Sequence, residues 1–365
     1  MNAVPVEDKA ENLRRQLVKE LVADGALTSD GWRAAFAEVP RHVFVPVFYR
    51  QAPGDQSAVD ANTPDEWLEG VYRDQLLVVS PDVKSSSTVP SLMAVMLEAL
   101  DPADGHRTLE IGTGTGYNAA LLCHRLGDSH VASVDIAADL VQAAGENLAG
   151  LGYRPMLGIG DGADGWVGGA LYDRIIATCA PNRVPQAWID QTRAGGRIVT
   201  PIATGIAVID FDADHRGTGR FLPGPAFFMP LRPAPTPADL GSQITEILSA
   251  VATARSTELD ESFWFDSDFR FVQALAVPGL RFLTKLADSG IAIFTLPDGS
   301  WARIDQGTVS QGGPQKVWDL LEIAHQQWVE LGRPSRERFS LAIRPEAQEV
   351  RLGGTDASWQ LPELA

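Results

Sequence analysis

The pattern of hydrophobic and polar positions in this 365-residue chain changes near residue 90. Upstream, apolar residues at helical spacing predict a helix over 9–23, and a Thr-Ser-Asp cap signal predicts a second helix over 30–38. The proline-punctuated segment 39–46 predicts extended chain, and the polar, turn-rich segment 51–66 predicts a surface loop. Downstream, short apolar runs alternate with helical patterns. This alternation predicts an open, mostly parallel sheet covered by helices.

The alternating region contains a regular series of elements. The predicted helices are 90–100, 117–126, 138–151 and 185–193, and the predicted strands are 107–111, 130–134, 155–159, 172–178 and 196–201. Two further segments, 205–212 and 225–231, are typical of an antiparallel finish at one edge of the sheet. Prolines at 230, 233, 235 and 237 then interrupt the pattern and predict a domain boundary. Beyond them, helices at 238–254 and 314–331 mix with short strands, so we expect a smaller α+β domain.

Three alternate glycines, Gly112, Gly114 and Gly116, lie in the run LEIGTGTGYN over 109–118. Glycine lets the backbone turn sharply and approach a ligand closely, because it has no Cβ. The helix that follows presents free N–H groups at its N-terminus. Asp135 ends the next strand, and a carboxylate there can accept both hydroxyls of a ribose. The unit therefore predicts an adenosine-containing cofactor, with a plain strand-turn-helix as the alternative.

The spacing of the glycines narrows the choice of cofactor. A dinucleotide fingerprint has glycine at its sixth position, where this chain has Tyr117. Glu110 precedes the loop and would repel a pyrophosphate, whereas it would not repel the cationic S-adenosylmethionine. We therefore predict a methyltransferase that uses S-adenosyl-L-methionine and releases S-adenosyl-L-homocysteine, rather than a dehydrogenase.

In open parallel sheets, ligands bind at the carboxyl ends of the strands. The predicted cofactor-binding residues along this edge are Glu110, Gly112, Thr113, Gly114, Gly116, Asp135, Ile136, Asp161, Gly162 and Thr178. Asp161 lies between two glycines directly after a strand, where it suits an acceptor for the exocyclic amine of adenine. The alternative role for Asp161 is that of an Asx-turn residue.

A run of hydroxyl-bearing residues occupies 85–88, just before the helix that precedes the cofactor loop. Hydroxyls at a helix start commonly serve as caps. Several hydroxyls and free N–H groups beside a sulfonium are also suited to holding a carboxylate. We therefore predict that this segment binds an acidic substrate during methyl transfer.

Ordered motifs over about residues 10–232 give the chain a resemblance to a known family. They are Val39-Pro40-Arg41 with Phe44-Val45-Pro46, Tyr72-Arg73-Asp74-Gln75-Leu76, Ser86-Ser87-Thr88-Val89-Pro90 with Leu92-Met93-Ala94, Gly160-Asp161-Gly162, Tyr172-Asp173, Val184-Pro185-Gln186-Ala187, Asp190-Gln191, Gly195-Gly196-Arg197 and Phe228-Met229-Pro230-Leu231. Together they resemble the protein-L-isoaspartate O-methyltransferase family. The resemblance implies a Rossmann-like class I methyltransferase fold and esterification of the side-chain carboxyl of a peptide isoaspartate. The ester then closes to a succinimide, whose hydrolysis gives aspartate and isoaspartate.

The resemblance also implies the residues of the substrate site. The family's active-site serine falls at Thr88, so the predicted catalytic residues are Thr88, Ser87 and Ser86. The predicted substrate-binding residues are Ser85, Val89, Pro90 and Ala180. A carboxylate with a pKa near 4 is already ionised at pH 7, so no general base is required. Aligning it with the methyl group in a site that excludes water is expected to do most of the work.

Departures from the family pattern point to a specialised peptide substrate. Thr88 adds a methyl group beside the substrate, Leu76 replaces a proline, and the chain continues over 233–365 beyond the family's usual end. This long form resembles a divergent branch that is encoded with ribosomally made, cyclised peptides such as lanthipeptides, lasso peptides and graspetides. That branch methylates an ordinary aspartate, and the product is an aspartimide or isoaspartate. The predicted partner is therefore a modified precursor peptide. General protein repair, a non-catalytic binding module and small-molecule methylation are the alternatives.

Composition limits the partners and the compartment. The formal net charge of −17 and the isoelectric point near 4.7 argue against nucleic acid and anionic membranes. The two cysteines and six histidines show neither disulfide nor metal-ligand spacing, so we expect no metal. The sequence contains neither an N-terminal secretory core nor a membrane-spanning apolar run, so we expect a cytoplasmic enzyme.

These observations predict an α/β methyltransferase domain followed by a smaller α+β domain. The expected parts are 1–66, an N-terminal helical segment and loop that pack on the catalytic domain; 67–232, the methyltransferase domain; 233–255, a proline-rich linker and helix; and 256–365, a substrate-recognition domain. Aromatic segments such as Phe263-Trp264-Phe265-Asp266 and Gln327-Trp328 are candidates for recognition. The alternative is that these side chains form the core of the small domain.

Overall fold

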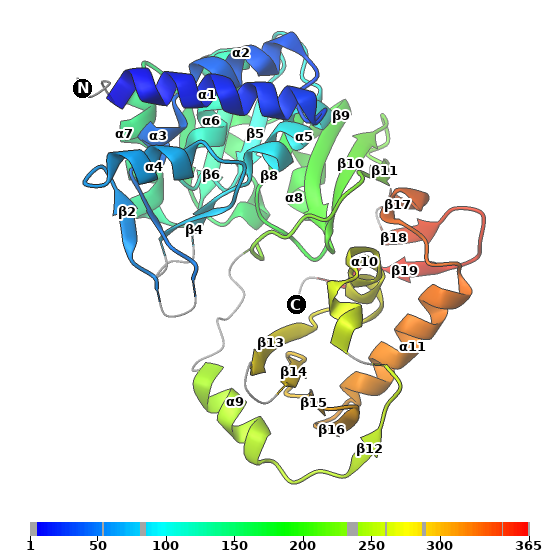
Figure 1. Ribbon diagram of the computed structural model, residues 1–365. Helices are drawn as coiled ribbons and strands as arrows, with labels where there is room; N and C mark the ends of the chain where they lie inside the picture. Colours follow the sequence, from blue (N-terminus) through cyan, green and yellow to red (C-terminus); the bar gives the residue numbers. More distant parts are fainter. Residues whose placement is uncertain are drawn as a thin grey trace. The chain divides into compact units, whose positions relative to one another are not determined.

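The computed structural model describes residues 6–52, 55–80, 85–231, 240–259, 261–286, 290–344 and 346–363 (Figure 1). The chain divides into two compact units. The first comprises Met1–Cys179, Val184–Thr200 and Val208–Arg216, and the second comprises Ala180–Arg183, Pro201–Ala207 and Gly217–Ala365. The boundary predicted at residue 233 does not coincide with this division, and the four-part domain scheme stays a prediction.

A parallel sheet forms the centre of the first unit. Its strands are β5 (Thr108–Ile111), β6 (Val131–Asp135), β7 (Met156–Ile159), β8 (Tyr172–Ala177) and β9 (Thr192–Ile202), in the spatial order β9-β8-β5-β6-β7. Adjacent strands are parallel throughout, and Leu109 lies opposite both Ala132 and Ile175. The chain runs outward from β5 to β7 and then returns to the other side of β5. This reversal creates a topological switch point between β5 and β8, where open sheets bind ligands.

Helices alternate with these strands, as the sequence pattern predicts. α5 (Pro90–Leu100), α6 (Tyr117–Leu126) and α7 (Ala138–Gly150) confirm three predicted helices, and α8 (Gln186–Asp190) is shorter than predicted. α5 contacts β8, whereas α6 and α7 contact β6. The side chains between them, including Leu97, Leu121, Val134, Ile175 and Ile176, are fully buried. Each contributes about 1.5–3 kcal/mol through removal of apolar surface from water.

Two N-terminal helices complete the first unit. α1 (Val6–Ala23) contacts α5, and α2 (Asp30–Glu38) packs along α6 (Figure 1). α1 was expected from its apolar spacing and α2 from the cap signal before it, and Leu21 and Phe36 on these helices are buried.

Two segments before residue 90 differ from the expectation. Residues 39–46 were expected to be extended but contain a short helix, α3 (Arg41–Phe44). Pro40 precedes this helix, and the side chains at its two ends, Arg41 and Phe44, are buried in the core. The predicted surface loop at 51–66 contains β2 (Ala58–Asp60) and the start of α4 (Pro64–Val71). Pro64 occupies the first turn of α4, a position that suits proline because the missing N–H would have no helical partner there.

The serine run belongs to a small antiparallel sheet. Its order is β2, β1 (Val47–Tyr49), β3 (Leu77–Ser80) and β4 (Ser85–Ser87). β4 pairs with β3 so that Leu77 lies opposite Ser87 and Val78 lies opposite Ser86. The run is therefore a strand at the edge of this sheet, followed directly by α5.

In the second unit, strands distant in sequence pair with one another. β11 (Gly217–Phe221), β17 (Phe339–Arg344), β18 (Ala347–Leu352) and β19 (Ser358–Gln360) are antiparallel neighbours in that order, and β10 (Gly205–Phe211) precedes β11 in the chain. The strand predicted at 225–231 is wrong. Among the described residues this segment forms no strand but an isolated parallel bridge between Pro230 and Ala180, and its prolines lack the amide donors of a regular ladder.

A five-stranded antiparallel sheet forms the rest of the second unit. Its order is β12 (Ala254–Ser256), β16 (Thr308–Gly312), β15 (Trp301–Asp305), β14 (Ile291–Thr295) and β13 (Arg281–Leu286). α9 (Leu240–Ser249) and α11 (Val317–Glu330) contact β15, and α10 (Ser267–Ala276) packs on α11. Phe263, Phe269, Phe294 and Trp318 are buried and lie in ring contact around Phe263. These aromatic side chains form the core, whereas Phe265 is 75% exposed.

Candidate active site

The glycine loop joins β5 to α6 at the switch point of the sheet. Gly112 has a φ of 96°, and a Cβ there would lie 2.6 Å from Thr178 Oγ1. Thr178 donates its hydroxyl to the carbonyl of Gly112 at 2.8 Å. Gly114 has a φ of 51°, and a Cβ there would meet no atom within 4 Å. The loop is thus anchored at Gly112 and open at Gly114, where a ligand can approach the backbone.

Asp135 lies beside the open part of this loop. Its Oδ2 accepts a hydrogen bond from the amide of Gly114, and its Oδ1 accepts one from the amide of Ala137, both at 3.0 Å. Each carboxylate oxygen has a second lone pair, so two further hydroxyl groups can donate to it. The neighbouring Ile136 is 41% exposed. A ribose on Asp135 and an apolar ring on Ile136 fit this arrangement.

Asp161 follows the adjacent strand β7. Its Oδ1 accepts a hydrogen bond from the amide of Ala163 at 2.9 Å, so the Asx turn foreseen as its alternative role is present. Among the described residues Oδ2 has no recorded partner and is available to an amine donor. The amide of Gly160 donates to the carbonyl of Asp135 at 3.0 Å, which places the ends of β6 and β7 side by side. Gly162 is buried, and its carbonyl accepts a hydrogen bond from Trp188 Nε1 at 2.7 Å.

Glu110 lies behind the loop rather than on its open side. The carboxylate is fully buried and accepts hydrogen bonds from Asn118 Nδ2 at 2.7 Å and from Ser133 Oγ at 2.6 Å. Ser133 Oγ shares a hydrogen bond of 2.7 Å with Thr113 Oγ1, which ties the carboxylate to the loop. Burial raises the pKa of Glu110 to about 7. Because the side chain has no exposed surface, it can position the loop from behind. The predicted contact of Glu110 with the cofactor stays a prediction.

A buried arginine holds the predicted substrate segment. Arg41 Nη2 donates to Ser87 Oγ at 3.1 Å and to the carbonyl of Thr88 at 3.0 Å, and Nη1 donates to the carbonyl of Val71 at 2.7 Å. Burial lowers the pKa of Arg41 to about 10, so the guanidinium remains charged at pH 7. Among the described residues no carboxylate lies within ion-pair distance of it. The sequence motifs predicted no role for Arg41, although a charged residue inside the apolar run 39–46 is typical of a buried side chain with polar partners.

Arg41 also connects the substrate segment to the cofactor loop. Its Cζ lies 5.9 Å from the ring centroid of Tyr117, the first residue of α6 after the glycines. Thr88 and the start of α6 therefore contact the same buried cation. This is the geometry by which the first unit brings the two predicted halves of the site together.

The residues of the segment differ in accessibility. Ser85 and Ser87 are buried, whereas Ser86, Thr88 and Val89 are half-buried. Because Ser87 bonds to Arg41, the accessible hydroxyls are those of Ser86 and Thr88.

The hydroxyl groups of the run do not cap the following helix. Val89 is the N-cap of α5 and makes no side-chain cap bond, and Pro90 is the first residue of the helix. Asp74 Oδ1 instead accepts a hydrogen bond from the amide of Ser91 at 2.8 Å. Asp74 belongs to the Tyr72–Leu76 motif, so that motif supports the first turn of α5.

Ala180, the last predicted substrate residue, belongs to the second unit. Its amide donates to the carbonyl of Met229, and its carbonyl accepts from the amide of Leu231, both at 2.8 Å. Its role towards the substrate stays a prediction.

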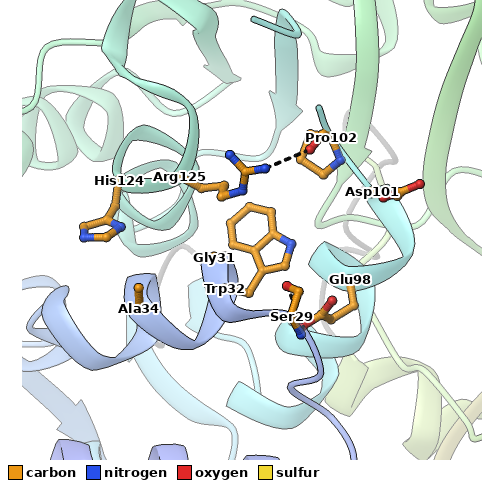
Figure 2. A pocket seen from close by; sticks show the side chains of 9 residues that line it. All are labelled: Ser29, Gly31, Trp32, Ala34, Glu98, Asp101, Pro102, His124 and Arg125. Carbon is orange, nitrogen blue, oxygen red and sulfur yellow. Dashed lines mark hydrogen bonds between the residues drawn. The ribbon is translucent and has the colours of Figure 1, made fainter. Parts of the chain in front are cut away.

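A cavity of about 340 Å³ lies elsewhere in the first unit, between α2 and the last turns of α5 and α6 (Figure 2). Two of its charged groups have partners: Glu98 Oε1 accepts from the amide of Ser29 at 2.8 Å, and Arg125 donates to Asp104 at 2.6 Å. α6 starts at the cofactor loop and rises about 1.5 Å per residue, so the cavity is a helix length away. It is not part of the site described above.

Two further properties concern the described part of the chain. Within it, no group of three or more histidine, cysteine, aspartate or glutamate side chains is arranged to hold a metal ion. None of its helices combines the length and the apolar character required to cross a bilayer.

The parallel sheet with its switch point, the glycine loop and the acid at the end of β6 define a class I methyltransferase. The sequence profile of the family described as Protein-L-isoaspartate(D-aspartate) O-methyltransferase (PCMT) matches residues 11–219, more than half of the chain. The chain therefore belongs to the protein-L-isoaspartate O-methyltransferase family. It is a methyltransferase, and its cofactor is S-adenosylmethionine.

Individual relatives agree with this assignment. The protein-L-isoaspartate O-methyltransferase of Ignicoccus hospitalis is 32% identical over 194 residues, which cover 53% of this chain and 82% of the relative. Protein-L-isoaspartate O-methyltransferase 1 of Archaeoglobus fulgidus is 31% identical over 220 residues, which cover 60% and 93% of the two chains.

One solved structure of a protein-L-isoaspartate O-methyltransferase matches well beyond the catalytic part. It superimposes with a TM-score of 0.54 and 25% identity over 93% of this chain and 99% of its own. The C-terminal region is thus not confined to this chain, and the match is consistent with the expected C-terminally extended branch of the family.

Proposed function

We propose that the chain transfers the methyl group of S-adenosylmethionine to the side-chain carboxylate of an aspartyl or isoaspartyl residue in a peptide. The observation that carries the proposal is Arg41, which contacts both the accessible Thr88 turn and the start of the cofactor helix. Family membership supports the reaction, and the half-buried hydroxyls of Ser86 and Thr88 support binding of an anionic acceptor.

The residues of the site account for the reaction without an acid or base. The cofactor supplies an electrophilic methyl group on a sulfonium. Asp135 and Asp161 would hold its adenosine part, and Glu110 keeps the loop in shape from behind. The Thr88 hydroxyl donates to one oxygen of the ionised acceptor, while the buried charge of Arg41 favours an anion at this position. Positioning the nucleophilic oxygen in line with the methyl group is the main contribution.

Within this activity, we propose an ordinary aspartate in a cyclised, ribosomally made precursor peptide as the acceptor, with aspartimide or isoaspartate as the product. Thr88 supports this specificity, because its methyl group narrows the space beside an acceptor where the family pattern has serine. Such a peptide is made in the cytoplasm, where we place the enzyme. General repair of isoaspartyl proteins is the second candidate, favoured by the solved family member that aligns with 93% of this chain.

Mass spectrometry of three peptides separates these candidates. The full chain and S-adenosylmethionine are incubated with a linear isoaspartyl peptide, a linear aspartyl peptide and a cyclised aspartyl peptide. A methyl ester that then loses methanol, confined to the cyclised peptide, supports the biosynthetic role. Methylation confined to the isoaspartyl peptide supports repair, and no methylation of any peptide contradicts the proposed activity. The Thr88→Ser variant is expected to gain activity on the isoaspartyl peptide if Thr88 sets the preference.

A further inference from the structure

An arginine in the second unit is held between two aromatic rings. Arg270 lies on α10, and its Cζ is 4.2 Å from the ring centroid of Phe227 and 4.3 Å from that of Trp264. Phe227 comes from the segment after β11, and Trp264 precedes α10. Three segments of the second unit therefore meet at this guanidinium.

This arginine lacks the acidic partner that Arg255 and Arg336 of the same unit have. Arg255 pairs with Asp319 and Glu322, and Arg336 pairs with Asp268. Among the described residues, Arg270 makes no recorded ion pair or hydrogen bond, and its buried Nε has no acceptor. Acidic residues outnumber basic ones by 47 to 30, so an arginine without a carboxylate is not explained by scarcity of acids.

Two aromatic side chains with different surroundings contact Arg270. The ring of Trp264 also contacts Phe282 and Phe294 at centroid distances of 5.3 Å, so one side of the sandwich is anchored in the core. Phe227 is 51% exposed and covers the other side. With two rings against Cζ and no hydrogen-bond partner among the described residues, the Nη groups are the donors that a carboxylate can bind.

We propose that Arg270, between Phe227 and Trp264, binds a carboxylate of the peptide substrate other than the one that is methylated. The proposal rests on the proposed function for the identity of the ligand as a peptide. The position of Phe227 in the chain is consistent with this role. Residues 229–231, which follow it, pair with Ala180, a residue predicted to bind the substrate. The carboxylate comes from an acidic side chain or from the peptide C-terminus, and both present the same two oxygens.

Binding of fluorescent peptides to the full chain tests this subsite without turnover. Three isoaspartyl peptides are compared by fluorescence anisotropy: one with flanking glutamates and an amidated C-terminus, one with glutamines and an amidated C-terminus, and one with glutamines and a free C-terminal carboxylate. We expect one of the two carboxylate peptides to bind about tenfold more tightly than the neutral one, the effect of one charge-assisted hydrogen-bonded pair. Which peptide does so identifies the source of the carboxylate.

Variants connect the preference to Arg270. Arg270→Gln should remove the preference while the neutral peptide binds as before, and Arg270→Lys should retain only part of it, because lysine lacks the fork. The matched control is Arg333→Gln, since Arg333 is exposed and lies over one ring, that of Trp328, at 5.6 Å. The control should keep the preference.

Equal binding of all three peptides to the wild type overturns the proposal, as does a preference that survives in Arg270→Gln. Loss of affinity for the neutral and acidic peptides alike would assign Arg270 a purely structural role and also overturns it. Methyl transfer is measured separately on the same peptides. Turnover without any dependence on Arg270 refutes only the subsite, whereas absence of methyl transfer refutes the proposed function.

Discussion

At the residue scale, Asp135 combines two roles in one carboxylate. It accepts hydrogen bonds from two backbone amides, and its free lone pairs face the open part of the loop. Asp135→Ala is therefore expected to weaken S-adenosylmethionine binding by roughly a hundredfold or more, since two hydrogen bonds to a charged group are lost. Isothermal titration calorimetry measures this effect. Asp135→Asn, which keeps an acceptor oxygen, should lose less, and unchanged affinity in Asp135→Ala would refute the ribose assignment.

Glu110 makes the stability depend on pH. Its pKa rises from 4.5 to about 7 on folding, so the folded state binds more protons between these values. Stability therefore falls as the pH rises through this window, and the loss persists above it. Glu110→Gln should raise the free energy of unfolding relative to the wild type by about 2–3 kcal/mol more at pH 8 than at pH 5.

Chemical denaturation of the cofactor-free protein at the two pH values measures this difference. Glu146→Gln is the matched control, because Glu146 is exposed on α7. A wild type and a Glu110→Gln variant with the same pH dependence would show that the buried carboxylate is not the titrating group.

At the scale of elements, the turn between β4 and α5 depends on a side chain from α3. The planar guanidinium of Arg41 donates hydrogen bonds to the Thr88 carbonyl, the Ser87 hydroxyl and the Val71 carbonyl. Arg41→Lys keeps the charge but cannot reach all three acceptors. We expect kcat for the methyl acceptor to fall about tenfold or more, while the affinity for S-adenosylmethionine changes little.

Steady-state kinetics and calorimetry together test this expectation. The matched control is Arg14→Lys, because Arg14 donates to the carbonyl of Ala37 from α1 and lies outside the Thr88 turn. Equal loss of kcat and of cofactor affinity in Arg41→Lys would indicate general disruption of the fold instead of a displaced turn.

At the scale of the whole molecule, Arg336 joins segments of the second unit that are far apart in sequence. It is 1% exposed, donates to the carbonyls of Thr204 and Ser267 at 2.6 Å, and pairs with Asp268 at 3.2 Å. Arg336→Met removes the partner of these half-buried groups and the hydrogen bonds that join the segments. We expect a loss of about 3–5 kcal/mol in the free energy of unfolding.

Denaturant unfolding measures this loss, with Arg338→Met as the control because Arg338 is exposed two positions away. A loss below 1 kcal/mol would contradict the role of Arg336.

The pairing of β17 with β11 has a consequence for deletion experiments. Removal of residues 238–365 deletes β17, the strand that pairs with β11, and would therefore disturb the fold as well as recognition. Point variants such as Arg270→Gln test substrate recognition without this disturbance.

Local patterns predicted the first unit well. The helices at 30–38, 90–100 and 117–126 begin and end where expected, because apolar spacing, proline and glycine act within a few residues. Pairings between distant segments were not predictable in this way. β17 (339–344) pairs with β11, which lies more than a hundred residues earlier in the chain. The hydrophobic periodicity of either strand does not indicate which other strand it pairs with.

The sequence by itself determined the cofactor loop and its class of ligand. Three alternate glycines and an acid at the end of the next strand are local features, so the loop and its ligand class can be read without knowing which distant segments support it. Only the tertiary structure decided which charged side chains face a ligand. Glu110 lies buried behind the loop, Arg41 supports the Thr88 turn from a distant helix, and Arg270 lies between two rings. Burial and partners determine what a charge does, and both arise only when distant segments pack together.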